Sequence, residues 1–255
     1  LPESVGGSGL GIAALIPVVE SMGKGLMGTP LVSTVLAAEL IRRAGGIAEE
    51  DVLEDISGGC AATVAYLDGS DWGATNTGVS VDANGVLSGS KFMVPDAAQA
   101  TWIAVVGSDA AGDAVVALVA GRDVAAQAQA SHALIDLTKR ASTLDFTGVK
   151  AQRVLSGDKV ASAIRDYLLI GALLTAAEAV GSTSACLAGI VDYLKTRKQF
   201  GKLIGSFQAL KHPTVDIYVG MEHSRSLVYQ AYSEIDDGPL SAEAEVACRI
   251  AKANA

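Results

Sequence analysis

The sequence predicts an α+β fold, in which a central antiparallel β-domain lies between two helical regions. Apolar residues recur at helical spacing from Gly9 to Gly45 and again after Gly157, while short β-rich runs separated by turn residues fill the stretch between. Half of the 255 residues are hydrophobic and 18% are charged, which is typical of a well-packed globular chain. We therefore expect an N-terminal helical domain over 1–60, a middle β-domain over 61–157 and a C-terminal helical bundle over 158–255.

The N-terminal region shows the apolar periodicity of amphipathic helices. Its apolar residues form two runs, one through Ile12, Leu15, Ile16 and Val19 and one through Leu31, Val35, Leu36 and Leu40. The pair Gly45-Gly46 is expected to end the second run, because glycine terminates helices.

Two hairpins are predicted in the middle region. Asn84-Gly85 separates Val79–Val81 from Val86–Ser88, and both of these turn residues tolerate the positive φ that a two-residue hairpin turn requires. A second hairpin is predicted over 103–119, around Asp109–Asp113. Consecutive hairpins indicate an antiparallel sheet.

The C-terminal region has a sustained helical period. It predicts three helices, over Ala161–Lys195, Ser206–Asp236 and Ser241–Ala255. The most apolar stretch, Tyr167–Leu194, is interrupted by Glu178 and Asp192, so it lacks the roughly 18 uncharged apolar residues of a membrane span. We interpret it as a helix buried inside a bundle and expect no membrane partner.

Charge and cysteine content narrow the class of protein further. The formal net charge is −9 and the pI is near 4.8, which argues against nucleic acid and anionic membranes as partners. The three cysteines are far apart and form no C-x-x-C pair, so neither a disulfide framework nor a zinc site is predicted. The histidines form no H-E-x-x-H pattern, and we expect no metal. The chain opens on Leu-Pro-Glu without a signal sequence, so a cytoplasmic location is expected.

The most informative segment is Arg197–His212, with the sequence RKQFGKLIGSFQALKH. It places a guanidinium, two amides and two phenyl rings on a short connection between long helices. A guanidinium fork suits a pyrophosphate, so the segment is a candidate nucleotide site. The alternative interpretation is a helix–helix connection with a solvated basic end.

This segment resembles the R-x-Q/T-F-G-x-x-I-x-x-F/H-Q signature of the acyl-CoA dehydrogenases. Three further segments resemble that family in the same order along the chain: Leu1–Leu10, Gly89–Trp102 and Leu144–Val149. The match is to bacterial, actinobacterial-like members, and it implies that the first and last helices of the family fold lie outside this sequence.

The resemblance implies FAD as cofactor and assigns residues to it. Arg197 is the implied pyrophosphate partner, with Gln199 beside it, Phe200 near the adenine, and Phe207 and Gln208 as the F/H-Q pair. In the family these residues reach the flavin of a neighbouring subunit, so a homo- or hetero-oligomer is implied. Core packing is the alternative role of the two phenylalanines.

The resemblance also assigns three residues of the β-domain to the flavin, and all three depart from the family pattern. Leu67 stands where the family commonly has a side-chain hydroxyl, and Met93-Val94-Pro95 stands where it often has Trp-Ile-Thr. Met93 is a less planar wall than tryptophan, and Pro95 offers neither a hydroxyl nor an N–H. The departure at Leu67 and the departure at Met93-Val94-Pro95 both count against flavin binding by this subunit.

The reaction that the resemblance implies is α,β-desaturation of an acyl-CoA thioester, with hydride transfer to FAD and an electron-transfer flavoprotein as the next carrier. A carboxylate base is required. In most members it would lie beyond Ala255, and the position used by a minority falls on Gly171. Glu178 is interpreted as a helix-face residue, so no catalytic residue is identified.

Two functions therefore stay open at this point. The chain is part of an acyl-CoA dehydrogenase of fatty acid or steroid side-chain metabolism, or it is a non-catalytic partner subunit of a heteromeric one. The second would supply Arg197 and Gln208 to a partner's flavin.

Overall fold

The computed structural model describes residues 1–45, 49–70, 78–124 and 129–255. Their contacts form two compact units, and each is treated below by itself. The first unit comprises 1–10 and 28–168, and the second comprises 11–27 and 169–255. The long helix α4, Lys159–Thr196, contributes its first turns to one unit and the rest to the other. The division into domains over 1–60, 61–157 and 158–255 stays a prediction.

The helices of the first unit are α2, Leu31–Gly45, and α3, Glu50–Ser57. Helix α2 is described up to Gly45, and Gly46, the second residue of the predicted stop, lies outside the described residues. Helix α3 was not predicted, because five acidic residues over 49–55 make the segment look like a solvated charge run. Its three apolar residues nevertheless share one face and are buried: Val52, Leu53 and Ile56.

Among the described residues, eight strands form one mixed sheet. The strands are β1 Ala62–Ala65, β2 Val79–Val81, β3 Leu87–Pro95, β4 Trp102–Ser108, β5 Ala114–Ala120, β6 Gln129–Ser131, β7 Ala141–Asp145 and β8 Arg153–Leu155. Their order is β6-β7-β3-β2-β4-β5-β8, with β1 pairing β4. The predicted antiparallel pairing holds for most neighbours, but β1 and β2 both pair with β4 in parallel. Sequence spacing reveals hairpins, whereas a parallel pair joins strands that are remote along the chain.

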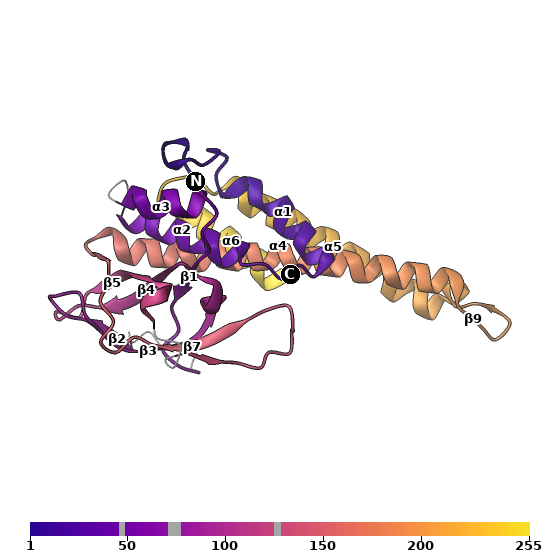
Figure 1. Ribbon diagram of the computed structural model, residues 1–255. Coiled ribbons are helices and arrows are strands. Elements are labelled where there is room, and N and C mark those ends of the chain that lie inside the picture. Colours follow the sequence, from indigo (N-terminus) through magenta and orange to yellow (C-terminus); the bar gives the residue numbers. More distant parts are fainter. Residues whose placement is uncertain (46–48, 71–77, 125–128) are drawn as a thin grey trace. The chain divides into compact units, whose positions relative to one another are not determined.

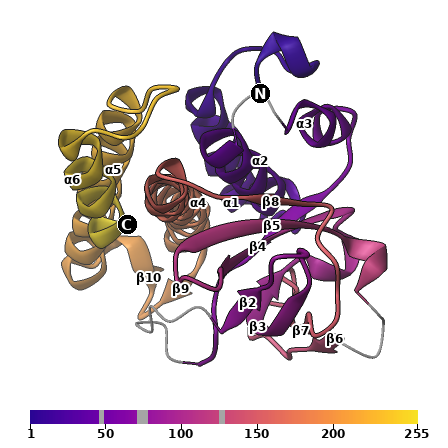
Figure 2. The ribbon, with the colours of Figure 1, turned by 90° about the vertical axis from the view of Figure 1, so that its left-hand side faces the viewer.

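The core of the first unit lies on both faces of β4 and β5. Alternate residues of these strands face two apolar clusters, which explains why β5 reads as the unbroken apolar run AVVALVA. Helices α2 and α3 cover one face (Figure 2). Residues of β3 and β7 cover the other, among them Leu87, Val94 and Leu144.

Both predicted hairpins exist, but the first has a different turn. Val81 pairs with Leu87, so the loop spans Asp82–Val86 instead of Asn84-Gly85 alone. Gly85 has the expected positive φ of 77°, whereas Asn84 is not among the residues with positive φ. The side chain of Asp82 explains the longer loop, because its Oδ1 accepts hydrogen bonds from Asn84 N and Val86 N, each at 2.8 Å.

The second unit is helical. Its elements are α1 Ile16–Gly25, the main part of α4, α5 Gln208–Ser233 and α6 Ala242–Asn254. Helices α1 and α4 pack closely because glycines meet backbone there: a Cβ on Gly181 would lie 1.9 Å from Glu20 O. Ser182 Oγ adds a hydrogen bond of 3.1 Å to Gly23 O. The three predicted C-terminal helices are confirmed as α4, α5 and α6, within a few residues at each end.

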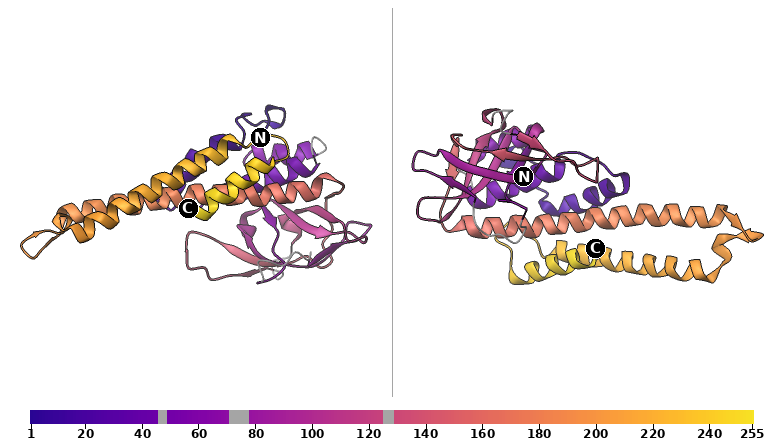
Figure 3. Two further views of the ribbon diagram at one scale, coloured as in Figure 1. Left: turned by 180° about the vertical axis from the view of Figure 1, so that it is seen from behind. Right: turned by 90° about the horizontal axis from the view of Figure 1, so that it is seen from below.

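Helix α4 is long and apolar enough to cross a membrane when a few charged residues are allowed in it, although length and composition alone are weak evidence for a span. Half of its most apolar window is buried inside the protein, and the core helix of a bundle meets the same criteria. Helices α4 and α5 run antiparallel and are joined at their far end by a small hairpin (Figure 3).

Candidate functional site

The hairpin that joins α4 to α5 carries the first set of predicted site residues. Strands β9, Lys198–Gln199, and β10, Lys202–Leu203, pair antiparallel around the turn Phe200-Gly201 (Figure 1). The two turn residues have φ values of 51° and 72°, the left-handed backbone of a type I′ turn. A phenylalanine is unfavourable in that conformation, because its Cβ crowds the following carbonyl.

Arg197 lies at the base of this hairpin. Its backbone is fixed, since its N–H donates to Tyr193 O and its carbonyl accepts from Ile204 N, both at 2.9 Å. Its guanidinium is exposed and has no hydrogen bond or ion pair to any residue that the structure describes. The arrangement leaves a full guanidinium fork available to an anion.

The hairpin and its flanks form a basic tip on an acidic chain. We define the basic tip as residues 193–215, which contain no acidic residue and carry five cations: Lys195, Arg197, Lys198, Lys202 and Lys211. Against the formal net charge of −9, this concentration of positive charge favours an anionic ligand at the tip.

The two phenylalanines of the signature lie together. Their ring centroids are 6.2 Å apart and the planes meet at 88°, so Phe200 and Phe207 form an edge-to-face pair. The Phe200 side chain is 89% exposed, so core packing within this chain does not account for it. Gln199 and Gln208 are exposed too, and Gln208 begins α5, where the first backbone N–H groups have no helical acceptor. Their roles as cofactor ligands stay predictions.

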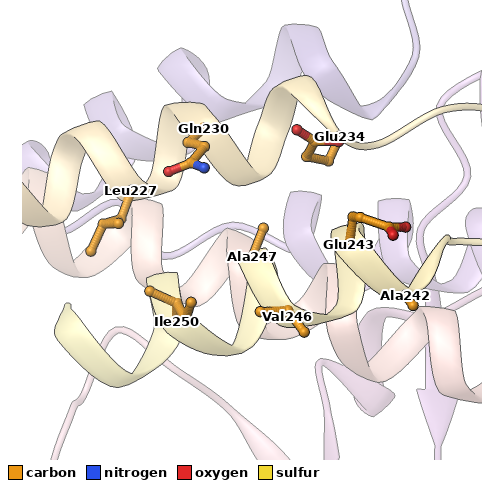
Figure 4. A pocket seen from close by; sticks show the side chains of 8 residues that line it. All are labelled: Leu227, Gln230, Glu234, Ala242, Glu243, Val246, Ala247 and Ile250. Carbon is orange, nitrogen blue, oxygen red and sulfur yellow. The ribbon is translucent and has the colours of Figure 1, made fainter.

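An apolar cavity of about 470 Å³ is formed mostly by residues of the basic tip. It is lined from α4 by Val191 and Leu194, and from the hairpin and α5 by Leu203 and Val215. None of the predicted site residues lines it. A second cavity of about 450 Å³ lies between α5 and α6, with Glu234 and Glu243 at one end (Figure 4).

Strand β3 carries the second set of predicted site residues. Its pairing with β7 shifts register between Lys91 and Val94, which marks a β-bulge. Met93 lies in this bulge with φ 52°, although the bulge between Lys91 and Val94 contains no glycine. Strained backbone of this kind is often found at functional sites, and it is held only where surrounding contacts enforce it. No residue type in KFMVP indicated the bulge in advance.

Leu67 and Met93 are brought close together by the backbone. Phe92 N donates to Leu67 O over 2.7 Å, which joins the segment after β1 to the bulge. Pro95 is exposed, and its carbonyl accepts from the buried Thr63 Oγ1 over 2.6 Å. The three β-domain residues thus share one neighbourhood, and their contact with a flavin stays a prediction.

Sequence reasoning missed the buried lysine of this neighbourhood. Lys91 is 1% exposed, and its Nζ donates to Tyr66 O at 3.0 Å and to the carboxylate of Asp68. Burial lowers the pKa of Lys91, and the bond to Asp68 opposes that shift. The strand alternation was an available signal, because Leu87 and Lys91 fall on the same inward face.

The helical unit offers no base at the position that the resemblance suggested. Gly171 lies on α4 and has no side chain to take a proton. The carbonyl of Glu178 accepts from Ser182 Oγ at 3.0 Å and lies against Gly23 of α1, which places Glu178 at a helix contact. Among the described residues, no cluster of three His, Cys, Asp or Glu side chains could hold a metal ion.

Comparisons with known proteins match this chain along most of its length. Residues 161–255 match the family model described as acyl-CoA dehydrogenase, C-terminal domain. The acyl-CoA dehydrogenase IpdE2 of Mycobacterium tuberculosis is 31% identical over 91% of this chain and 59% of its own length. This chain therefore spans about 59% of that relative.

Solved structures give the same result. The ChsE4-ChsE5 complex from Mycobacterium tuberculosis is 28% identical with a TM-score of 0.82, covering 98% of this chain and 67% of that one. The Tcur3481-Tcur3483 steroid ACAD variant is 29% identical with a TM-score of 0.83, covering 99% of this chain and 68% of that one. This chain is therefore similar to acyl-CoA dehydrogenases along most of its length, and its residues 161–255 match the C-terminal domain of that family.

Proposed function

We propose that the protein catalyses α,β-desaturation of an acyl-CoA thioester, using FAD as the hydride acceptor. The observation that carries the proposal is the basic tip, where a rigid type I′ hairpin presents the available guanidinium of Arg197 beside an exposed phenyl ring. The similarity to acyl-CoA dehydrogenases, a family that uses FAD, supports the same cofactor. Bound FAD would supply the hydride acceptor of the reaction.

The residues of the tip fit one end of that cofactor. The Arg197 fork can bind a pyrophosphate in a bidentate way, and Phe200 offers an aromatic face to an adenine. Gln199 and Gln208 add exposed amides, which can donate and accept hydrogen bonds. The ligand that these groups suit is a dinucleotide held by a neighbouring subunit, so we propose a homo- or hetero-oligomer.

The bulge of β3 fits the flavin end through its backbone. Leu67 and Pro95 provide no side-chain donor, so donors here must come from N–H groups of the main chain. Met93 offers a soft apolar surface beside them. A carboxylate base is not assigned to any residue of this chain.

A non-catalytic partner subunit is the second candidate function. It is favoured by Gly171 at the alternative base position and by the missing donors at Leu67 and Pro95. Two similar structures support it, because their names each pair two proteins: ChsE4-ChsE5 and Tcur3481-Tcur3483. In this case the basic tip would complete the FAD site of the other subunit.

One experiment separates the two functions. The full-length protein is purified alone and together with any co-encoded homologue, and flavin absorbance is recorded before and after anaerobic addition of a panel of fatty and steroid acyl-CoAs. Flavin that is bound and bleached in the protein alone supports the dehydrogenase. Flavin that appears only with the partner supports the second candidate, and no flavin in either sample contradicts both.

We also propose an electron-transfer flavoprotein as the physiological acceptor and a cytoplasmic location. The first follows from the proposed chemistry, since a reduced flavin must be reoxidised. The second agrees with the cysteines, which form no disulfide in the part of the chain that the structure describes.

A further inference from the structure

Lys91 is a buried charge in the β-domain that the proposed chemistry does not use. Its side chain is 1% exposed on a strand whose other inward residues are apolar. Burying an ammonium group is costly unless it is fully hydrogen-bonded. Here its partners are Tyr66 O, at 3.0 Å, and the carboxylate of Asp68. Both belong to the segment that leaves β1.

Three hydrogen bonds join β1 and the segment that leaves it to β3. Lys91 Nζ reaches Tyr66 O, Phe92 N reaches Leu67 O at 2.7 Å, and Thr63 Oγ1 reaches Pro95 O at 2.6 Å. They span the stretch in which the β3–β7 ladder changes register. The side-chain bonds of Lys91 thus tie the segment after β1 to β3 directly before the strained bulge, where the pairing with β7 is interrupted.

The site around Asp68 is shaped for this contact. Gly78 begins the next described segment, and a Cβ there would lie 3.2 Å from Asp68 Cβ and Oδ1. A lysine is suited to the task because its ammonium has three donors, which can serve a carbonyl and a carboxylate together. A methionine would fill a similar volume but would donate nothing.

We propose that Lys91 is a positioning residue, which holds the backbone of 66–68 against the β3 bulge and so sets the flavin affinity of the β-domain. It does so without touching the flavin. The inference rests on the proposed function, because it assumes that this neighbourhood binds the flavin end of FAD. The inference goes beyond the proposed function, because it assigns the geometry of the site to the Lys91–Asp68 ion pair, which the family resemblance did not indicate.

The test separates positioning from mere stabilisation. Replacing a buried ion pair by apolar residues of similar volume is often neutral for stability. The full-length protein, with its partner if one is required, is therefore made as Lys91→Met and as the double variant Lys91→Met/Asp68→Leu. Urea unfolding of the apoprotein and the FAD dissociation constant, from quenching of flavin fluorescence, are measured for each. Lys150→Met, an exposed lysine of the same unit, is the matched control.

We expect Lys91→Met to lower the urea midpoint and to weaken FAD binding. The double variant should recover the urea midpoint, but its FAD binding should stay about 10-fold weaker than that of the wild type, which is the effect of one lost charged hydrogen bond. A double variant that binds FAD like the wild type would show that Lys91 only stabilises the fold. If the Lys91 variants do not fold, Asp68→Asn and Asp68→Leu decide: the amide keeps an acceptor and should retain FAD, whereas leucine should not. A wild type without FAD affinity would instead remove the proposed function itself.

Discussion

Two hairpins of this molecule differ in the residue that takes the left-handed backbone conformation and in the hydrogen bonds of their polar groups. In the β2–β3 hairpin the left-handed position is occupied by Gly85, and Asp82 Oδ1 accepts the hydrogen bonds of two loop N–H groups. In the β9–β10 hairpin a left-handed position is occupied by Phe200, and the adjoining guanidinium of Arg197 has no partner among the described residues. The hydrogen bonds of the β2–β3 turn are made within the loop itself, whereas the guanidinium beside the β9–β10 turn is left available for a ligand.

The difference indicates which hairpin is structural and which binds a ligand. A turn whose residues agree with its backbone needs nothing from outside. A turn that places an aromatic residue at positive φ and exposes it gives up local stability, and such departures cluster at functional sites. We therefore expect substitutions in the first hairpin to change stability alone, and substitutions in the second to change ligand binding.

The largest expected effect is at Arg197. A charge-assisted hydrogen bond contributes about 1.5–3 kcal/mol, so Arg197→Ala should weaken FAD retention by about 10- to 100-fold. Helix content measured by circular dichroism should not change, because the guanidinium has no partner in the described chain. Arg249→Ala on α6 is the matched control, since it removes another exposed arginine. Undiminished FAD binding by Arg197→Ala would contradict the site assignment.

The next effect should appear in the other hairpin and only in stability. Gly85→Val forces a β-branched residue to φ 77°, which should lower the free energy of unfolding by roughly 1 kcal/mol or more. Steric crowding adds little, because the new Cβ would lie 3.8 Å or more from its neighbours. Urea unfolding measures the loss, and FAD retention per folded molecule should equal that of the wild type. A changed FAD affinity would break the distinction between the hairpins.

Phe200→Gly should have the opposite effect to Gly85→Val, weakening FAD binding without loss of stability. Removing a left-handed phenylalanine relieves backbone strain, so the unfolding free energy should stay equal or rise by up to about 1 kcal/mol. FAD retention should nevertheless fall by about 2- to 10-fold, because an aromatic contact is lost. Urea unfolding and FAD titration of the same sample measure the change in stability and the change in FAD binding. A variant that loses stability as well would mean that the Phe200–Phe207 pair supports the fold.

The sequence predicted those features of the two hairpins that depend on single residue types. Gly85 indicated a positive φ, and the R-K-Q-F-G run indicated the exposed tip, because these properties follow from the residue types without knowledge of tertiary contacts. The loop over Asp82–Val86 was not predicted, since an aspartate can also reach its own loop and lengthen the turn.

The β-domain site was harder to predict, because its geometry is set by tertiary contacts. Beside the bulge at Met93, Phe92 N donates to Leu67 O and Lys91 Nζ donates to Tyr66 O, and no local pattern specifies these contacts between segments that are remote along the chain. Helix α3 was missed for a related reason. Its acids obscure a short apolar face that becomes recognisable only when α2 and β4 are in place.

The smallest expected effect concerns the charge of Asp82. Hydrogen bonds from Val86 N and then Asn84 N hold the pKa of this carboxyl below its ordinary value. A lowered folded pKa means that the ionised form stabilises the fold above the ordinary aspartate pKa of about 3.9, and that this contribution is lost as pH falls through the folded pKa. Asp82→Asn keeps an acceptor oxygen but cannot ionise. The wild type should therefore have the higher urea midpoint at pH 5–6, and the two midpoints should converge as pH falls below the ordinary aspartate pKa. A constant difference across this range would mean that the hairpin is held by the shape of the side chain and not by its charge, and FAD retention should be equal in both proteins throughout.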